Sequence, residues 1–251
     1  MKPFLLVSTR PEDEALDAEY QTFLKVTRLE ESELEQLRLD MLGLPEVDVR
    51  DYRGVLVAGS PYGTTTPAAR KSATQVRTEQ ELVHIFDDLR HHEVPCLTTG
   101  FGTEVAALTG GGVVSRKWRE GPGMVDILLT PQGRHDPLLD GFPAEFHAYV
   151  DHREAVEEVP EGAVVLAGSI SCPAQVIRLD RRIWATQFNP ELDSDAINGR
   201  LQAFEDAGYP GTDDIESLLL VGRHGSCEHQ AGQLVRNFLR MCTQGDFARR
   251  D

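Results

Sequence analysis

The feature that most constrains the fold is an alternation of short apolar runs with helix-period patterns. Three runs have the length and composition of buried strands: Pro3 to Ser8, Gly54 to Ala58 and Val94 to Thr99. Helical spacing of apolar residues follows them, at Leu16, Tyr20, Phe23 and Leu24, at Leu82, Ile85, Phe86 and Leu89, and from Glu104 to Leu108. This order predicts an α/β fold in which a mainly parallel sheet is flanked by helices on both faces.

The second half of the chain has a different pattern. Strand candidates follow one another with little helix between them, at Val125 to Thr130, Ala163 to Ala167, Ala174 to Leu179 and Ile183 to Phe188. Such spacing predicts antiparallel hairpins. The chain then turns helical: Asp193 or Ser194 caps a helix with a buried stripe of Ile197, Leu201 and Phe204, Gly208 to Gly211 ends it, and a last helix carries Leu234, Val235, Phe238 and Leu239. Because no linker or repeat interrupts residues 1–251, we predict one domain with a C-terminal helical extension.

Charge and hydropathy argue against several classes of partner, and the cysteine spacing indicates free thiols. The chain has 41 acidic and 25 basic residues, a net charge of -16. A surface this acidic repels nucleic acid phosphates and anionic lipid, so neither is an expected partner. The apolar run Phe4 to Val7 is too short for a signal-peptide core, and no other run approaches a membrane span, which predicts a cytoplasmic protein. Four cysteines without CxxC spacing are interpreted as free thiols: Cys96, Cys172, Cys227 and Cys242.

The turn after the third strand has the pattern of a nucleophile elbow. Thr98 to Thr103 follows a predicted strand, is bracketed by Gly100 and Gly102, and leads into a helix. In an elbow, a strained turn presents one side chain beside backbone amides and a helix N-terminus. The residue at the apex is normally Ser or Cys, but here it is Gly100.

The segment PCLTTGFGTEVAALTGGGVV resembles the elbow of class I glutamine amidotransferases, which read Gly-hydrophobic-Cys-aromatic-Gly-x-Gln. The resemblance places Gly100 on the family's nucleophilic Cys and Glu104 on its Gln. It places Phe101 on the aromatic residue and Gly102 on the following Gly, whereas Thr98 departs from the family's first Gly.

Three further segments resemble the same family. Gln187-Phe188-Asn189-Pro190-Glu191 is similar to its Gln-Phe-His-Pro-Glu motif, with Asn189 at the position of the base and Glu191 at that of the orienting carboxylate. Val55 to Gly63 looks like the strand and loop that supply an oxyanion-hole amide. Asp151 to Leu179 looks like the corresponding segment of stand-alone, GMP-synthase-like members. The resemblance runs from about Val7 to Arg240 and implies a flavodoxin-like, class I glutamine amidotransferase-like fold.

The two substitutions imply a degenerate catalytic triad. Glycine cannot attack a carbonyl, and the amide of Asn189 is too weak a base to take a proton near neutral pH. The predicted function is therefore a non-catalytic pseudoenzyme that binds glutamine, a related small metabolite or a partner protein. The alternatives are an active hydrolase in which Thr103, Thr99, Cys96 or a bound water replaces the thiol, and a purely structural assembly component.

The resemblance also implies a set of binding residues. We expect Gly59, Ser60, Pro61, Phe101, Gly102, Glu104 and His152 to line the cleft. His152 falls where the family keeps a His or Ser near the active site. Glu191 either keeps the place of the family's orienting carboxylate or is structural and caps a backbone amide. The chain contains no ATP-binding synthetase motif, so ammonia transfer would need a separate synthetase-type protein.

No cofactor and no metal are predicted. The best ligand pattern, His224-x-x-Cys227-x-His229, is interpreted as polar residues of a loop that enters a helix, because nothing nearby completes a four-ligand set. Cys96 is interpreted as a buried, inert thiol, and Cys172 as part of a structural lead-in to a strand.

Overall fold

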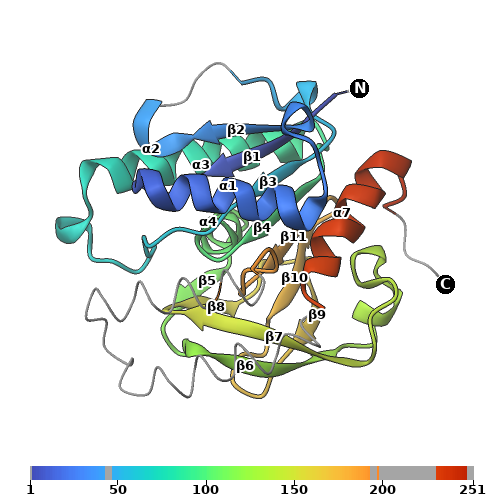
Figure 1. Ribbon diagram of the computed structural model, residues 1–251. Coiled ribbons are helices and arrows are strands. Elements are labelled where there is room, and N and C mark those ends of the chain that lie inside the picture. Colours follow the sequence, from blue (N-terminus) through green and yellow to red (C-terminus); the bar gives the residue numbers. More distant parts are fainter. Residues whose placement is uncertain (1, 43–46, 193–196, 198–229, 248–251) are drawn as a thin grey trace.

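A computed structural model shows the protein as a large mixed sheet between two helical layers (Figure 1). The structure describes residues 2–42, 47–192, 197 and 230–247. The strands are β1 (Phe4–Ser8), β2 (Leu34–Arg38), β3 (Val55–Val57), β4 (Cys96–Thr99), β5 (Val113–Ser115), β6 (Glu120–Leu129), β7 (Glu145–His152), β8 (Ala155–Glu158), β9 (Val164–Gly168), β10 (Val176–Asp180) and β11 (Ile183–Thr186). The helices are α1 (Asp13–Thr27), α2 (Leu39–Leu42), α3 (Ala73–His91), α4 (Phe101–Thr109) and α7 (Gly232–Gln244).

Nine strands form one sheet in the order β2-β1-β3-β4-β11-β10-β9-β6-β7. The first five of these pair in parallel, and β10, β9, β6 and β7 continue the sheet with antiparallel pairing. The predicted parallel half and the predicted antiparallel hairpins are both confirmed. A separate two-stranded sheet pairs β5 with β8.

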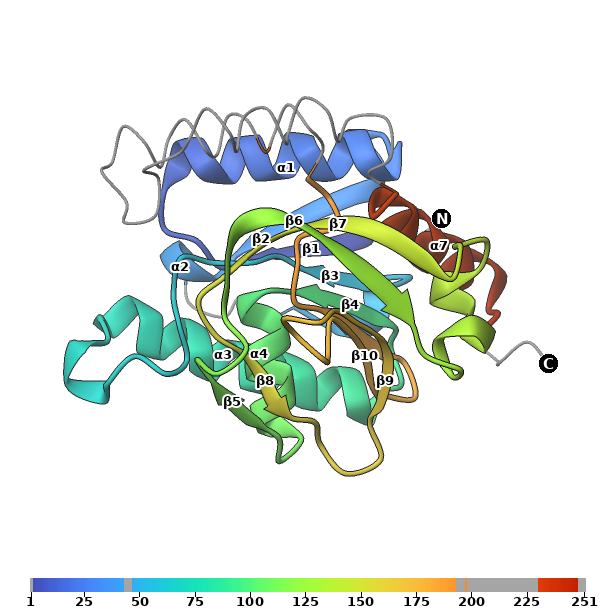
Figure 2. The same cartoon turned by 90° about the horizontal axis from the view of Figure 1, so that it is seen from below.

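Residues of the parallel strands alternate between two apolar cores. In β1, Phe4 and Leu6 face the core shared with α1 and α7, whereas Leu5 and Val7 face the core shared with α3 and α4. Figure 2 shows α1 over one face of the sheet and α3 and α4 below the other. Because both faces are covered, the inner strands β1, β3, β4 and β11 are buried along their whole length and carry no charged residue, which is why they were predictable from sequence.

Four strands were not predicted: β2, β5, β7 and β8. Two of them, β2 and β7, are the edges of the nine-stranded sheet and carry charged residues between apolar ones, as in Leu34-Glu35-Gln36-Leu37-Arg38. An edge strand leaves one side in water, so its apolar run is interrupted. The predicted helix at Asp193 to Phe204 and the turn at Gly208 to Gly211 lie outside the described residues, except for Ile197, which is buried against Tyr149.

Three of the four cysteines, Cys96, Cys172 and Cys242, are free thiols, and Cys227 lies outside the described residues. In the part of the chain that the structure describes, no helix combines the length and apolar character needed to cross a bilayer.

Candidate functional site

Gly100 forms the tight turn between β4 and α4. Its φ of 49° and ψ of -119° are angles that residues with a Cβ rarely adopt, so glycine removes the strain that another residue would have. The Gly100 amide donates to the carbonyl of Thr186 at 3.0 Å, and its carbonyl accepts from the Glu104 amide at 3.2 Å. These bonds join the turn to β11 on one side and begin α4 on the other.

Asn189 lies against this turn. A Cβ placed on Gly100 would be 3.5 Å from Asn189 Oδ1 and 3.6 Å from the Gly59 Cα, and a Cβ on Gly59 would be 3.4 Å from the same Oδ1. The carboxamide therefore lies beside both glycines, just beyond the carboxyl ends of β3, β4 and β11. Glu191 follows two residues later and is 5% exposed. Neither Gly100 nor Asn189 supplies a nucleophile or a base at this point.

Two other elbow residues serve packing. A Cβ on Gly102 would overlap Thr98 Oγ1 and lie 2.7 Å from Val57 Cγ1, so only glycine lets α4 approach the sheet this closely. The Phe101 ring is buried and meets Tyr62 edge to face, with 6.0 Å between ring centroids. Both residues therefore stabilise the elbow through packing contacts.

The other hydroxyls and thiol near the elbow are held within the fold. Thr103 Oγ1 lies within hydrogen-bonding distance of two carbonyl oxygens, that of Thr98 at 3.1 Å and that of Thr186 at 2.9 Å, and can donate to either. Thr99 is 2% exposed and lies 3.5 Å from the Val57 carbonyl. Cys96 is fully buried, and burial raises the pKa of its thiol far above the usual value.

The loop after β3 turns its side chains in different directions. Ser60 Oγ donates to the Thr9 carbonyl and accepts from the Tyr62 amide, both at 3.3 Å, so its hydroxyl stabilises the turn. Pro61 is exposed. Gly59, Ser60 and Pro61 are thus consecutive residues of one loop, of which Gly59 contacts Asn189.

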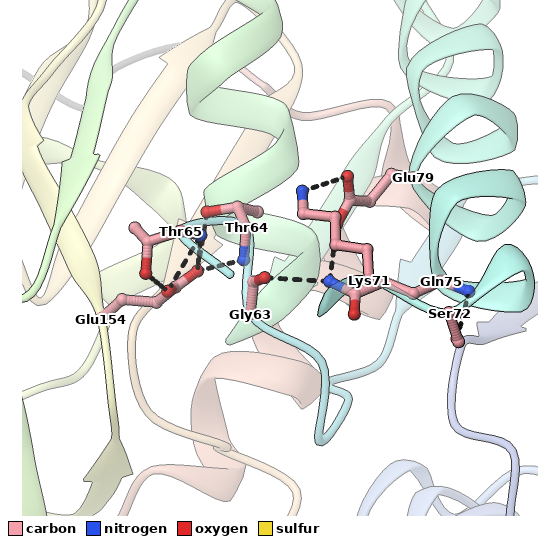
Figure 3. A network of polar contacts seen from close by, with 8 residues as sticks. All are labelled: Gly63, Thr64, Thr65, Lys71, Ser72, Gln75, Glu79 and Glu154. Carbon is pink, nitrogen blue, oxygen red and sulfur yellow. Dashed lines mark hydrogen bonds and ion pairs between the residues drawn. The ribbon is translucent and has the colours of Figure 1, made fainter. Parts of the chain in front are cut away.

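Glu154, which was not predicted as a site residue, binds the continuation of this loop (Figure 3). Its carboxylate accepts from the amides and hydroxyls of Thr64 and Thr65, with Thr64 Oγ1 at 2.7 Å and the Thr65 amide at 3.1 Å. On the other side of the loop, Gln75 Nε2 of α3 donates to the Gly63 carbonyl at 2.9 Å. The loop is therefore fixed between the β7–β8 connection and α3.

Glu104 and Glu154 form a coupled pair of buried acids, at 4% and 3% exposure. Burial raises the pKa of Glu104 well above its ordinary value, and the hydrogen bond and negative charge of Glu154 raise it further. Burial also opposes ionisation of Glu154, but hydrogen bonds from Glu104, Thr64 and Thr65 outweigh it and lower the pKa of Glu154. Of the two, Glu104 therefore keeps its proton to higher pH, and Glu154 ionises first.

His152 belongs to a different polar cluster. Its Nε2 lies 2.7 Å from Glu120 Oε2, which also accepts from Gln175 Nε2 at 2.6 Å. Burial opposes the charge of Glu120, but hydrogen bonds from His152, Ser171 and Gln175 outweigh it and lower the pKa of its carboxyl group. The His152 imidazole therefore contacts Glu120, whereas the atoms within 4 Å of a Cβ at Gly100 belong to Asn189 and Gly59.

Two hollows lie elsewhere. One of about 480 Å³ is bordered by Arg90, Arg178 and Arg181 near the amino ends of the parallel strands, and one of about 380 Å³ lies between α3 and α4 beside Val76 and Leu108. The His224-x-x-Cys227-x-His229 segment lies outside the described residues.

Comparison with known proteins agrees with this geometry. Residues 19–202 match the family model described as glutamine amidotransferase class-I. The chain is 34% identical over 109 residues to a glutamine-hydrolyzing GMP synthase subunit from Methanoculleus marisnigri, covering 43% of this chain and 57% of that protein. It is 27% identical over 173 residues to the corresponding protein from Methanoregula boonei, covering 66% of this chain and 83% of that protein.

Among solved structures, a glutamine amidotransferase from Thermotoga maritima superimposes with a TM-score of 0.76 at 15% sequence identity, covering 97% of this chain and 99% of that one. At this identity the likeness concerns the fold.

Proposed function

Since the chain belongs to the class I glutamine amidotransferase family, we propose that it is a member that uses the family's site for binding and does not hydrolyse glutamine. One observation carries the proposal: a Cβ at Gly100 would lie 3.5 Å from Asn189 Oδ1, so the turn at Gly100 and the side chain of Asn189 adjoin at the two positions where nucleophile and base are expected. The elbow geometry is present without the groups that would react.

The expected loss of rate is large. Hydrolysis by a thiol needs an imidazole to take its proton and a carboxylate to orient the imidazole. Loss of the nucleophile or the base of such a triad costs on the order of 10^6 in rate, and losing the second adds little. Amide donors and binding alone leave roughly 10^3-fold over water, which does not sustain turnover.

The groups that could replace the thiol are poorly placed to do so. The hydroxyl of Thr103 is committed to backbone carbonyls, and Thr99 is buried beside the Val57 carbonyl. Cys96 lies inside the sheet with a raised pKa, so little thiolate forms. These contacts favour the non-catalytic function over an altered hydrolase.

The proposed ligand is glutamine or a related small metabolite, and the proposed protein partner is a separate synthetase-type chain. The relatives from Methanoculleus and Methanoregula are each named as one lettered subunit of GMP synthase, a name that supports a second, separate chain. Burial and the neighbouring Glu154 raise the pKa of Glu104, and when protonated its carboxyl group can donate a hydrogen bond at the position where the family resemblance places Gln.

An assay of ammonia release from glutamine tests the catalytic part. We expect the purified chain to release ammonia at the rate of the protein-free blank, and to leave a glutamine-mimicking electrophile unreacted. Turnover that persists through repurification, and that falls in Cys96→Ser or Thr103→Val, would favour the altered hydrolase instead.

Melting measurements test the binding part. A ligand at 100 times its dissociation constant stabilises the folded state by about 2.7 kcal/mol. We expect glutamine to raise the Tm of the wild type, and Gly59→Val, which fills the space beside Asn189, to abolish the rise. Gly121→Val is the matched control because a Cβ on Gly121 meets nothing within 4 Å. No shift with glutamine or with related amino acids would count against a metabolite site.

A further inference from the structure

A second cluster of reactive side chains lies where β6 begins and β7 ends, beside the loop between β9 and β10. Glu120 begins β6, His152 ends β7, and Cys172 lies in the loop between β9 and β10. The β6–β7 register pairs Glu120 with His152 directly. A carboxylate oxygen, a ring nitrogen and the thiol sulfur of these residues lie within 4.8 Å of one another.

All three side chains are buried, at 7%, 6% and 0% exposure for Glu120, His152 and Cys172. Burial of three such groups together is costly unless each is satisfied. The imidazole is only partly satisfied: its Nε2 contacts Glu120, but its buried Nδ1 has no hydrogen-bond partner among the described residues. Gln175 Oε1, on the amide that donates to Glu120, is a second buried acceptor with no partner in that part of the chain.

We propose that Glu120, His152 and Cys172 bind a zinc ion, with water as the fourth ligand. Thiolate, imidazole and carboxylate are the three kinds of side chain that bind Zn²⁺, and a thiolate excludes Mg²⁺ and Ca²⁺ as the preferred ion. Donor atoms around tetrahedral zinc are about 3.3 to 3.6 Å apart, given metal–ligand distances of about 2.0 to 2.3 Å. The donors lie within 4.8 Å of one another, so those farthest apart would approach by about 1 Å. His152 Nε2 and Glu120 Oε2, hydrogen-bonded at 2.7 Å, would instead separate by roughly 0.6 Å if both bound the ion.

The surroundings already resemble a supporting shell for such ligands. Ser169 Oγ donates to Glu120 Oε1 at 3.3 Å, and Ser171 Oγ donates to the same oxygen. Gln175 Nε2 donates to Glu120 Oε2 and to Ser169 Oγ, at 2.6 and 3.1 Å. Hydrogen bonds of this kind orient a carboxylate ligand and are typical of the second layer around a protein-bound metal.

The site would join three separate parts of the chain. Zinc would hold the β9–β10 loop, which contains the exposed Ile170, against the paired ends of β6 and β7. A water ligand would also bring a hydrogen-bond donor into the region of Gln175 Oε1. The proposal does not depend on glutamine binding, because Gly59, Gly100 and Asn189 take no part in it.

Metal titration of the full chain tests the proposal. The protein is stripped with a chelator and titrated with ZnCl₂ against a chromophoric chelator, and separately with CoCl₂. We expect one equivalent of either ion, a thiolate-to-cobalt charge-transfer band, and a rise in Tm with zinc of at least about 3 °C. Cys172→Ser should abolish the band and weaken zinc binding more than tenfold, whereas Cys242→Ser should change neither.

Other variants keep the outcome decisive. Cys227→Ser separates this site from the His224-x-x-Cys227-x-His229 segment: a band lost in this variant and kept in Cys172→Ser overturns the proposal. If Cys172→Ser does not fold, as circular dichroism would show, His152→Gln takes its place. Failure of the wild type to bind zinc, or cobalt binding without a thiolate band, also refutes the site.

Discussion

Introducing a thiol at residue 100 and an imidazole at residue 189 is the sharpest test of the proposed degenerate triad. We predict that Gly100→Cys with Asn189→His produces a reactive thiol, because a Cβ at residue 100 would lie 3.5 Å from Asn189 Oδ1, an ordinary contact distance. The obstacle is conformational, since a residue with a Cβ must adopt a φ of 49°. That strain costs about 1 to 3 kcal/mol of folding stability.

The expected magnitude follows from thiol ionisation. At pH 6 a thiol with an unperturbed pKa of about 8.5 is roughly 0.3% ionised, whereas one paired with an imidazolium and with a pKa of about 6 is half ionised. The gain of about 150-fold in thiolate is reduced roughly 10- to 20-fold, because a less basic thiolate is also less nucleophilic. Alkylation at pH 6 should therefore be about tenfold faster in the double variant than in Gly100→Cys alone. The two rates should cross near roughly pH 7.4, and at pH 9 the single variant should be about tenfold faster, because its thiol is then largely ionised and more nucleophilic.

The assay is iodoacetamide labelling across pH 5 to 9, with the wild-type rate subtracted for the native cysteines. Gly100→Ala is the matched control, because it carries the same backbone strain without a thiol, and its loss of unfolding free energy measures that strain. Both cysteine variants share the N-terminus of α4, so its dipole cancels in the comparison. Identical pH profiles in the single and double variants would show that residue 189 does not act on residue 100, and the degenerate-triad hypothesis would then fall while the fold stands.

Two further predictions concern stability. Glu104→Gln should stabilise the protein more at pH 8 than at pH 4, because the folded state raises the pKa of Glu104, and a carboxyl group with a raised pKa becomes destabilising as the pH rises above its unfolded value. The gain approaches about 1.4 kcal/mol for each unit of the shift once the pH exceeds the folded-state pKa. Urea unfolding at pH 4 and pH 8 measures this, with exposed Glu161→Gln as control, and an equal effect at both pH values would contradict it. Gly102→Ala should lower the free energy of unfolding by about 1 to 3 kcal/mol, because the added Cβ would overlap Thr98 Oγ1 and lie 2.7 Å from Val57 Cγ1. The control Gly121→Ala, whose Cβ meets open space, should remain within about 0.5 kcal/mol of the wild type. Equal effects of the two substitutions would show that α4 does not pack as closely as described.

The sequence predicted those parts of the fold whose residues are buried on both sides. β1, β3 and β4 are buried along their length and free of charged residues, and the glycines at 100 and 102 marked the turn into α4. The edge strands β2 and β7 were missed because water on one side permits charged residues within them. The site at His152 was also only partly predictable. His152, at the end of the edge strand β7, was singled out by resemblance, but its partner Glu120 lies at the start of β6, which was not predicted.

The same distinction explains which contacts of the site could not be read from sequence. Gly59, Gly100 and Asn189 meet because three parallel strands end at one edge of the sheet, an arrangement that the strand–turn–helix order predicts. Glu154, in the connection between β7 and β8, reaches Thr64, which lies 90 positions earlier in the chain. Local propensity does not predict a contact between segments so far apart in the sequence. A register shift of one residue between β6 and β7 would turn His152 to the opposite face and separate it from Glu120, which the present register places directly opposite. The cluster at Glu120 therefore depends on the alignment of β7 with β6, a non-local pairing that the local pattern of either strand does not encode.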